Sequence, residues 1–346
     1  MIDWLTFLIP FEHSEPINSG QVMSVCPDGE LQWSTHKAKP IQGSHDSRIQ
    51  IKSYGSTPDG FEFIHVTGNP VKFFQGHNLF GTDDISALLY ATLDEVLRIL
   101  SITPSPVELD SIYAGIIPIL RVDINQSYTL PSQSHVEAWL RSAENTAHMR
   151  HRGQGMMTKG TLYFGKHSRR WSFKFYSKAN EIKASGHTLP PALDTPQMHD
   201  WASSKLRAEL TLRSMTLKDM GLSLLSNWSK NLKLPQLIFN QYIERLHMAD
   251  SHTIPADVLA DLPPRLIGVY QLWILGHDLR ATYPRMTFYR YRKQLLEYGI
   301  DLAIKQDVTK KESNVIPLKL VLNVQPATVP EWAKNTPLYF EPRKTA

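Results

Sequence analysis

The sequence contains a single cysteine, Cys26, so an internal disulfide is excluded. No apolar run approaches the roughly 18 residues that a membrane-spanning helix needs. The first residues carry an acid, Asp3, where a secretory signal would carry base. No Gly-x-x-x-x-Gly-Lys-Ser/Thr sequence occurs, so nothing indicates a phosphate-binding loop for ATP. These absences predict a reduced, cytoplasmic protein that makes no membrane contact.

Acidic residues are scarce in one particular segment. The net charge of +4 is too small to identify a partner. Between Arg150 and Lys183, however, nine lysines and arginines accompany a single acid, Glu181. Such a segment has a strongly positive potential, so it predicts contact with a polyanion such as DNA.

The segments that are present favour an α+β fold up to about residue 225. With 346 residues, 42% of them hydrophobic, the chain has ample material for a packed core. Alternating or β-branched and aromatic runs predict strands over Asp3 to Ile9, Ile49 to Tyr54, Phe61 to Val66, Val71 to Gln75, Ile117 to Gln126, Gly160 to Phe164, Trp171 to Tyr176 and Leu206 to Leu212. Helical periodicity predicts helices over Asp84 to Leu100 and Ser134 to Thr146. We therefore expect a largely antiparallel central sheet with flanking helices, forming a domain over 1–225.

The remainder, 226–346, is expected to be a mostly helical DNA-binding domain. The predicted elements are helices over Pro235 to Met248, Ala256 to Leu262, Pro264 to Leu275 and Thr287 to Tyr298, and a late strand over Ile316 to Val324. Residues 264–300 have the outline of a helix-turn-helix unit. Its basic side chains are free to meet phosphates, and they are Arg285, Arg290, Arg292 and Lys293. A basic surface helix on a bundle fits the same pattern.

Three strand-like segments carry reactive groups on one side only, because side chains alternate along a strand. The polar sides present Arg121, Asp123 and Asn125; Arg207, Glu209, Thr211 and Arg213; and Ser172, Lys174, Tyr176 and Lys178. Carboxylates on neighbouring strands can share a hard divalent cation, so Asp123 and Glu209 are candidate ligands for Mg²⁺ or Mn²⁺. Tyr176 is a candidate nucleophile, and Lys178 could lower its pKa or neutralise developing charge.

Each of these residues also has a structural interpretation. Acids that alternate with arginines often form ion pairs, and most tyrosines on strands are half-buried structural residues. His77, in the polar turn after Gln75-Gly76, could be a third metal ligand, a DNA contact or a turn histidine with local hydrogen bonds. The pattern alone leaves these alternatives open.

The order and spacing of several short segments resemble a known family. They are Met1-Ile-Asp-Trp-Leu, Lys72 to Thr82 with Gln75-Gly-His-Asn at its centre, Arg121-Val-Asp, Thr161 to Glu181, Leu206-Arg-Ala-Glu, and Val315-Ile-Pro-Leu to Pro330-Glu-Trp. The chain resembles the gene II replication initiators of filamentous phages and, more distantly, the rolling-circle initiators of small plasmids. The His-hydrophobe-His metal motif of the wider rolling-circle nuclease superfamily is absent.

The resemblance implies a nicking and joining endonuclease. Tyr176 would attack the origin and stay linked to the 5′ end, leaving a free 3′ hydroxyl, with Lys178 beside it and Asp123 and Glu209 holding the metal. The implied partners are supercoiled double-stranded and single-stranded origin DNA, together with the host helicase and polymerase, in the bacterial cytoplasm. The bases expected to contact DNA in the first domain are Arg169, Arg170, Lys174 and Arg207. Two rivals are an origin-binding protein that does not cut, and a metal nuclease that uses water.

Overall fold

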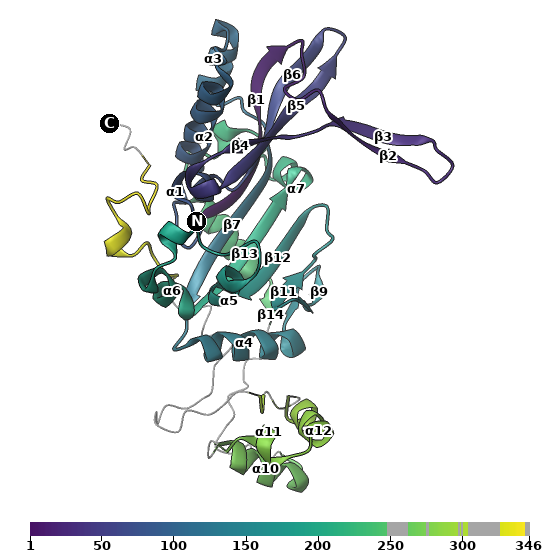
Figure 1. Cartoon of the computed structure of the whole chain (residues 1–346), viewed down its shortest axis with the longest axis vertical. Coiled ribbons are helices and arrows are strands. Elements are labelled where there is room, and N and C mark those ends of the chain that lie inside the picture. The colour runs from purple at the N-terminus through teal and green to yellow at the C-terminus, as the bar shows by residue number, and fades with distance from the viewer. Residues whose placement is uncertain (248–261, 275–276, 297, 299, 304–325, 343–346) are drawn as a thin grey trace.

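A computed structural model describes residues 1–247, 262–274, 277–296, 298, 300–303 and 326–342 (Figure 1). Its centre is a nine-stranded sheet in the order β10-β11-β12-β13-β7-β1-β6-β5-β4. Every neighbouring pair in this sheet is antiparallel. The expected α+β fold with a largely antiparallel sheet is therefore confirmed. Two expected elements, Ala256 to Leu262 and Ile316 to Val324, fall outside the described ranges except for Leu262.

The strands of the large sheet match most of the sequence predictions. Their bounds are β1 Ile2–His13, β4 Lys39–Gln42, β5 Arg48–Thr57, β6 Gly60–Gly68, β7 Ile119–Thr129, β10 Met156–Thr158, β11 Thr161–Phe164, β12 Trp171–Ser177 and β13 Lys205–Arg213. Smaller sheets contain β2 Gln21–Val25 with β3 Leu31–His36, and β8 His148–Met149 with β9 Gly153–Gln154 and β14 Leu246–His247. The β2–β3 hairpin, which the sequence analysis did not predict, projects from the sheet as an arm (Figure 1).

Side-chain caps mark where several of the helices begin. The helices are α1 Pro70–Gln75, α2 Ile85–Leu100, α3 Pro106–Tyr113, α4 Gln133–Thr146, α5 Lys178–Lys183, α6 Pro196–Ser203, α7 Ser214–Asp219, α8 Leu234–Ile243, α10 Pro264–Ile274, α11 Leu279–Thr282 and α12 Arg285–Leu296. Asp84 opens α2 by accepting a hydrogen bond from the backbone N–H of Ala87 at 2.9 Å. Ser132 caps α4 in the same way.

The strand expected over Val71 to Gln75 is wrong, because these residues form helix α1. Asn69 caps the helix by accepting from the backbone N–H of Lys72 at 2.7 Å, and Pro70 occupies its first turn. Gly76 ends it in the left-handed region with φ of 79°. These local start and stop signals outweigh the strand propensity of the valine and phenylalanines between them.

One face of the sheet is apolar and covered by helices. Trp139 of α4 packs on Phe175, with ring centroids 5.1 Å apart, and Phe239 of α8 packs on Phe173 at 5.3 Å. Residues as late as Leu246 belong to this core, so the packed unit that contains the sheet continues beyond residue 225. The alternate residues of β12 point to the opposite face, which is polar.

The helices α10, α11 and α12 pack around a second, separate core that includes Leu266, Trp273 and Phe288. They lie below the sheet unit in Figure 1. Asp301, after α12, accepts hydrogen bonds from Arg292 at 2.7 Å and from Arg141 of α4 at 2.7 Å. This carboxylate therefore ties the helical unit to the sheet unit.

The C-terminal segment 326–342 returns to the sheet unit. Trp332 packs edge-on against Phe80, and Phe340 stacks on Phe74 with centroids 5.0 Å apart. The backbone N–H of Phe340 also donates to the side chain of Gln75 at 2.9 Å. None of the helices in the described parts of the chain has the length and apolar character to span a membrane.

Candidate active site

The strand register brings the predicted polar residues onto one face of the sheet. Lys174 of β12 lies opposite Glu209 of β13, and Tyr176 lies opposite Arg207. On the other side of β13, Glu209 lies opposite Asn125 of β7. Thr211 lies opposite Asp123 in the same pair of strands. Asp123 and Glu209 are therefore diagonal neighbours on one face, a separation of about 7–8 Å between backbone positions.

The hydroxyl of Tyr176 is buried against a carboxylate. It donates a hydrogen bond to Oε2 of Glu209 at 3.2 Å, and the side chain is 6% exposed. The ammonium of Lys174 lies 5.3 Å from the centre of the tyrosine ring. Burial, together with the negative charges of Glu181 and Glu209, raises the pKa of Tyr176 well above its usual value near 10. The phenol is thus neutral in the free protein, and ionising it requires a group that takes its proton.

Both candidate metal ligands already have basic partners. Burial raises the pKa of Glu209 to about 7, although the ion pair with Lys174, at 2.8 Å, opposes that shift. Arg121 holds both carboxylate oxygens of Asp123, at 2.8 and 2.6 Å. Both acids thus form ion pairs, as one of the structural interpretations of the sequence expected.

The side chain of Asn125 is the feature of this face that fits a cation. Its amide nitrogen is buried and has no hydrogen-bond partner, although it sits directly across from Glu209. Turning the amide by half a turn exchanges its nitrogen and oxygen, which would add a third oxygen donor beside Asp123 and Glu209. Among the described residues, no three histidines, cysteines, aspartates or glutamates come close enough together to hold a metal. A cation here would thus use two carboxylates and an amide, and would have to replace at least one of their present partners.

His77 is fully engaged in the fold. Its Nε2 donates to the carbonyl of Leu338 at 2.9 Å, and its Nδ1 accepts from the backbone N–H of Leu79 at 3.2 Å. Burial lowers the pKa of His77 to about 3, so the ring is neutral. In this arrangement neither ring nitrogen is free to bind a cation.

Lys178 lies one residue beyond the strand, at the start of α5. Its ammonium is buried, donates to Oδ1 of Asn78 at 2.8 Å and pairs with Glu181. Asn78 in turn donates to Asp3 at 3.0 Å. Glu209 thus bonds the hydroxyl of Tyr176 and Lys174 lies over its ring, while Lys178 anchors α5 to the turn around Asn78.

Asp3, Asn78 and Glu181 form a network that the sequence did not predict. Asp3 is 7% exposed, and its negative charge helps to raise the pKa of Glu209. The only sequence signal for Asp3 is its place in Met1-Ile-Asp, a segment that resembles the known family. No spacing rule links residues 3, 78 and 181.

The bases expected to meet DNA fall into two groups. Arg207 is fully buried and donates to the carbonyls of Asn78 and Leu79, so it supports the turn and does not reach the surface. Arg169 is exposed, whereas Arg170 pairs with Asp219, and Lys174 is 31% exposed. In the helical unit Arg285, Arg290 and Lys293 are exposed, whereas Arg292 is held by Asp301.

Comparison with known proteins finds the same relationship along nearly the whole chain. Residues 1–231 match the family described as the N-terminal part of the phage replication-associated protein of gene II, and residues 264–339 match the family described as its C-terminal part. The replication-associated protein of gene II from Enterobacteria phage I2-2 is 38% identical over 338 residues, covering 97% of each chain. Those of phages fd and M13 are each 25% identical over 361 residues, covering 88% of this chain and 85% of theirs.

Proposed function

The chain belongs to the gene II replication-associated protein family of filamentous phages, and from this premise we propose that it starts rolling-circle replication by cutting one strand of the origin. The cut is a transesterification by Tyr176 that leaves a 5′-phosphotyrosyl link and a free 3′ hydroxyl. The observation that carries this proposal is the hydrogen bond from the Tyr176 hydroxyl to Glu209 on the polar face of the sheet.

The arrangement provides a base for a weak nucleophile. As the oxygen of Tyr176 forms its bond to phosphorus, its proton passes to Oε2 of Glu209, which accepts the hydrogen bond already. Burial favours the protonated form of this carboxyl, which suits it to take the proton. The bond from phosphorus to the 3′ oxygen breaks, and that oxygen leaves as a hydroxyl by taking a proton from water, to which Glu209 then returns the proton that it accepted. Lys174, beside the tyrosine ring, balances the negative charge that accumulates at the phosphate.

A divalent cation, Mg²⁺ or Mn²⁺, would be held by Asp123 and Glu209, with the amide of Asn125 as a further oxygen donor. When bound, it would polarise the scissile phosphate and stabilise the charge of the transition state. Arg121 and Lys174, which pair with these acids in the free protein, are then released to contact phosphate oxygens. His77 is assigned a structural role in this scheme, because both of its nitrogens are bonded within the fold.

The free 3′ hydroxyl is the end that a host polymerase would extend, with a host helicase separating the strands. After a round of synthesis, attack by a 3′ hydroxyl on the phosphotyrosyl bond releases Tyr176 and rejoins the displaced single strand. Both steps exchange one phosphodiester bond for another, so the energy of the bond is conserved and ATP is not required for joining. The exposed bases of α12 would hold the duplex part of the origin.

Burial of Tyr176 favours one rival, a metal nuclease in which water attacks and the tyrosine is structural. A phosphate can reach this hydroxyl only after the side chains around it rearrange. The deciding experiment incubates the protein with supercoiled DNA that carries the phage's own origin, with Mg²⁺ or Mn²⁺, and analyses the products on denaturing gels. We expect a nick in one strand and protein attached to its 5′ end. A nick with a free 5′ phosphate would support the rival, and an intact substrate would support an origin-binding protein that does not cut.

A further inference from the structure

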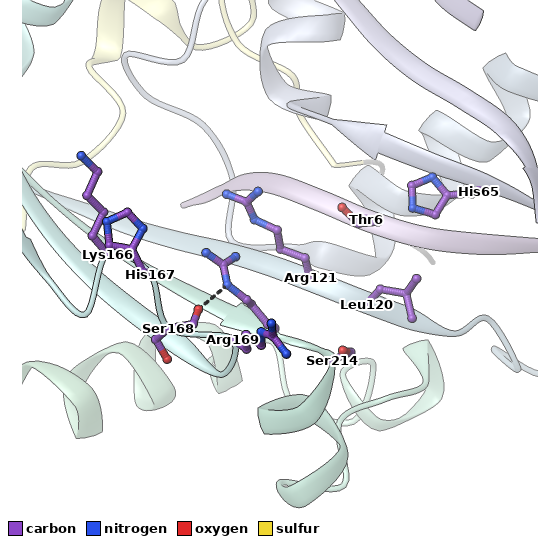
Figure 2. Close-up of a pocket in the computed structure, with 10 residues that line it drawn as sticks. Thr6, His65, Leu120, Arg121, Lys166, His167, Ser168, Arg169 and Ser214 are labelled. Atoms are coloured by element: carbon purple, nitrogen blue, oxygen red, sulfur yellow. Dashed lines mark hydrogen bonds between the residues drawn. The ribbon is translucent and has the colours of Figure 1, made fainter. Parts of the chain in front are cut away.

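A cavity of about 500 Å³ opens on the polar face of the sheet, at the end away from Tyr176. We call it the basic groove, and its lining includes Thr6, His65, Arg121, Lys166, Arg169 and Arg213. Figure 2 shows Arg121 of β7 and the loop residues Lys166, His167 and Arg169 gathered around one opening. The groove is thus built from residues that are far apart in the sequence.

The lining is cationic and contains no acidic side chain. Arg121 and Arg213 lie directly opposite each other on β7 and β13. Burial and the charge of Arg121 lower the pKa of Arg213, while the charge of Asp123, which pairs with Arg121, raises it. An anion between the two guanidinium groups would be attracted by both of them.

A specific contact holds the loop between β11 and β12 in place beside the strands. Nε of Arg213 donates to the backbone carbonyl of Ser168 at 2.9 Å. Arg213, Ser168 and the neighbouring Arg169 all line the groove. The loop between β11 and β12 therefore forms one wall of the groove.

The groove continues directly into the candidate active site. Arg121 lines the groove and also holds Asp123, two residues further along β7. Two residues of a strand span about 6.8 Å, so the groove and the acids Asp123 and Glu209 are close enough for one short DNA strand to reach both. A DNA strand with one phosphate at Asp123 and Glu209 would therefore place a neighbouring phosphate at the mouth of the groove.

We propose that the basic groove binds the backbone of the DNA strand that is cut, gripping a phosphate one or two nucleotides from the scissile bond. The inference rests on the proposed function and extends it by assigning a binding site for the flanking strand. Arg121 and Arg213 contact the phosphate from the sheet, and Lys166 and Arg169 contact it from the loop. The neighbouring Thr6 and His65 supply a polar floor.

The test compares two variants of the full chain that lose the same charge. In Lys166→Gln/Arg169→Gln the loss is in the loop wall of the groove. In the control, Lys230→Gln/Lys233→Gln, it is in an exposed segment that leads into α8, on the helix-covered side of the sheet. Binding of a fluorescent oligothymidylate is measured by anisotropy at several salt concentrations, without divalent metal. For the groove variant we expect an affinity on the order of tenfold lower at about 0.1 M salt, and a salt slope smaller by about 1.4, because two phosphate contacts are lost.

The control variant should match the wild-type protein in both affinity and slope. An unchanged slope in the groove variant, or an equal change in both variants, overturns the inference.

Position is tested with origin strands that carry one neutral methylphosphonate at successive phosphates around the mapped nick. One such position should weaken binding by the wild-type protein and have no further effect on the groove variant. If the groove variant shows the smaller salt slope but the wild-type protein never nicks origin DNA, the proposed function fails and the binding site stands. If the wild-type protein nicks and the groove variant has the same salt slope as the wild-type protein, the inference alone fails.

Discussion

The hydroxyl of Tyr176 and the carboxylate of Glu209 lie 3.2 Å apart across the β12–β13 strand pair. This contact joins the proposed nucleophile to a group that can accept its proton. Such a contact would allow a buried tyrosine to react, because its proton need not leave through solvent. The predictions below separate this chemistry from simple structural roles.

Replacing Tyr176 with phenylalanine should reduce nicking by roughly three orders of magnitude or more, because the nucleophile is lost. Binding of origin DNA should change little, and the loss of one hydrogen bond should lower the free energy of unfolding by about 1 kcal/mol. The matched control is Tyr128→Phe, which removes another buried hydroxyl, bonded to Gln126 at 3.0 Å. Full cleavage by Tyr176→Phe would exclude a covalent intermediate on this residue.

The substitutions Asp123→Asn and Glu209→Gln should each reduce nicking at least about a hundredfold while leaving origin affinity largely intact. Metal binding can be followed without activity, since Mn²⁺ should raise the melting temperature of the wild-type protein but not of these variants. Asn125→Ala should weaken the Mn²⁺ effect without abolishing it. Equal loss of DNA binding in the acid variants would point to DNA contact or misfolding.

The stability of the metal-free protein should depend on pH through Glu209. Its folded pKa of about 7 lies above the ordinary value of 4.5, so the folded state favours the protonated form. The stabilisation of the folded state by protonated Glu209 is therefore fully present below about pH 4.5, and it is lost as pH rises through 7. Denaturant unfolding in EDTA should show this fall in the wild-type protein relative to Glu209→Gln. Parallel pH profiles for the two proteins would contradict the raised pKa.

His77→Ala tests whether this histidine is a ligand or a structural residue. We expect the free energy of unfolding to fall by about 1–3 kcal/mol, because the hydrogen bond to the carbonyl of Leu338 is lost in a buried site. The stabilisation of the folded protein by Mn²⁺ should persist. The neutral ring, with a pKa of about 3 against 6.5, contributes stability above pH 6.5 that is lost as pH falls towards 3. Loss of the Mn²⁺ effect in His77→Ala, but not in the exposed His167→Ala, would make His77 a ligand.

Neutralising exposed bases of α12 should weaken binding to duplex origin DNA. In Arg290→Gln/Lys293→Gln the salt slope should fall by about 1.8, because two phosphate contacts are removed. Arg292→Gln is the contrast: Asp301 already neutralises this guanidinium, so the substitution should loosen the junction with α4 and change the slope little. Unchanged duplex affinity in the double variant would remove α12 from the DNA interface.

The sequence by itself determined which side chains share a face of each strand, because alternation is a local property of an extended backbone. That is why Asp123, Lys174, Tyr176 and Glu209 could be grouped in advance. The family relationship and the basic segment were also readable from the chain. The capping residue Asn69 and the following Pro70 could have predicted α1, but the valine and phenylalanines after them favour a strand.

Only the tertiary structure decided which of these groups touch. Strand register placed Asn125, not Asp123, opposite Glu209, and a register is fixed by packing over the whole sheet. Arg207 is buried and donates to the carbonyl of Asn78, so it supports that turn. His77 donates to the carbonyl of Leu338, which is 261 residues away in the sequence. The basic groove likewise exists only because the antiparallel sheet brings β1, β6, β7 and a loop together. Such contacts depend on the free energy of packing distant segments, which no local pattern contains.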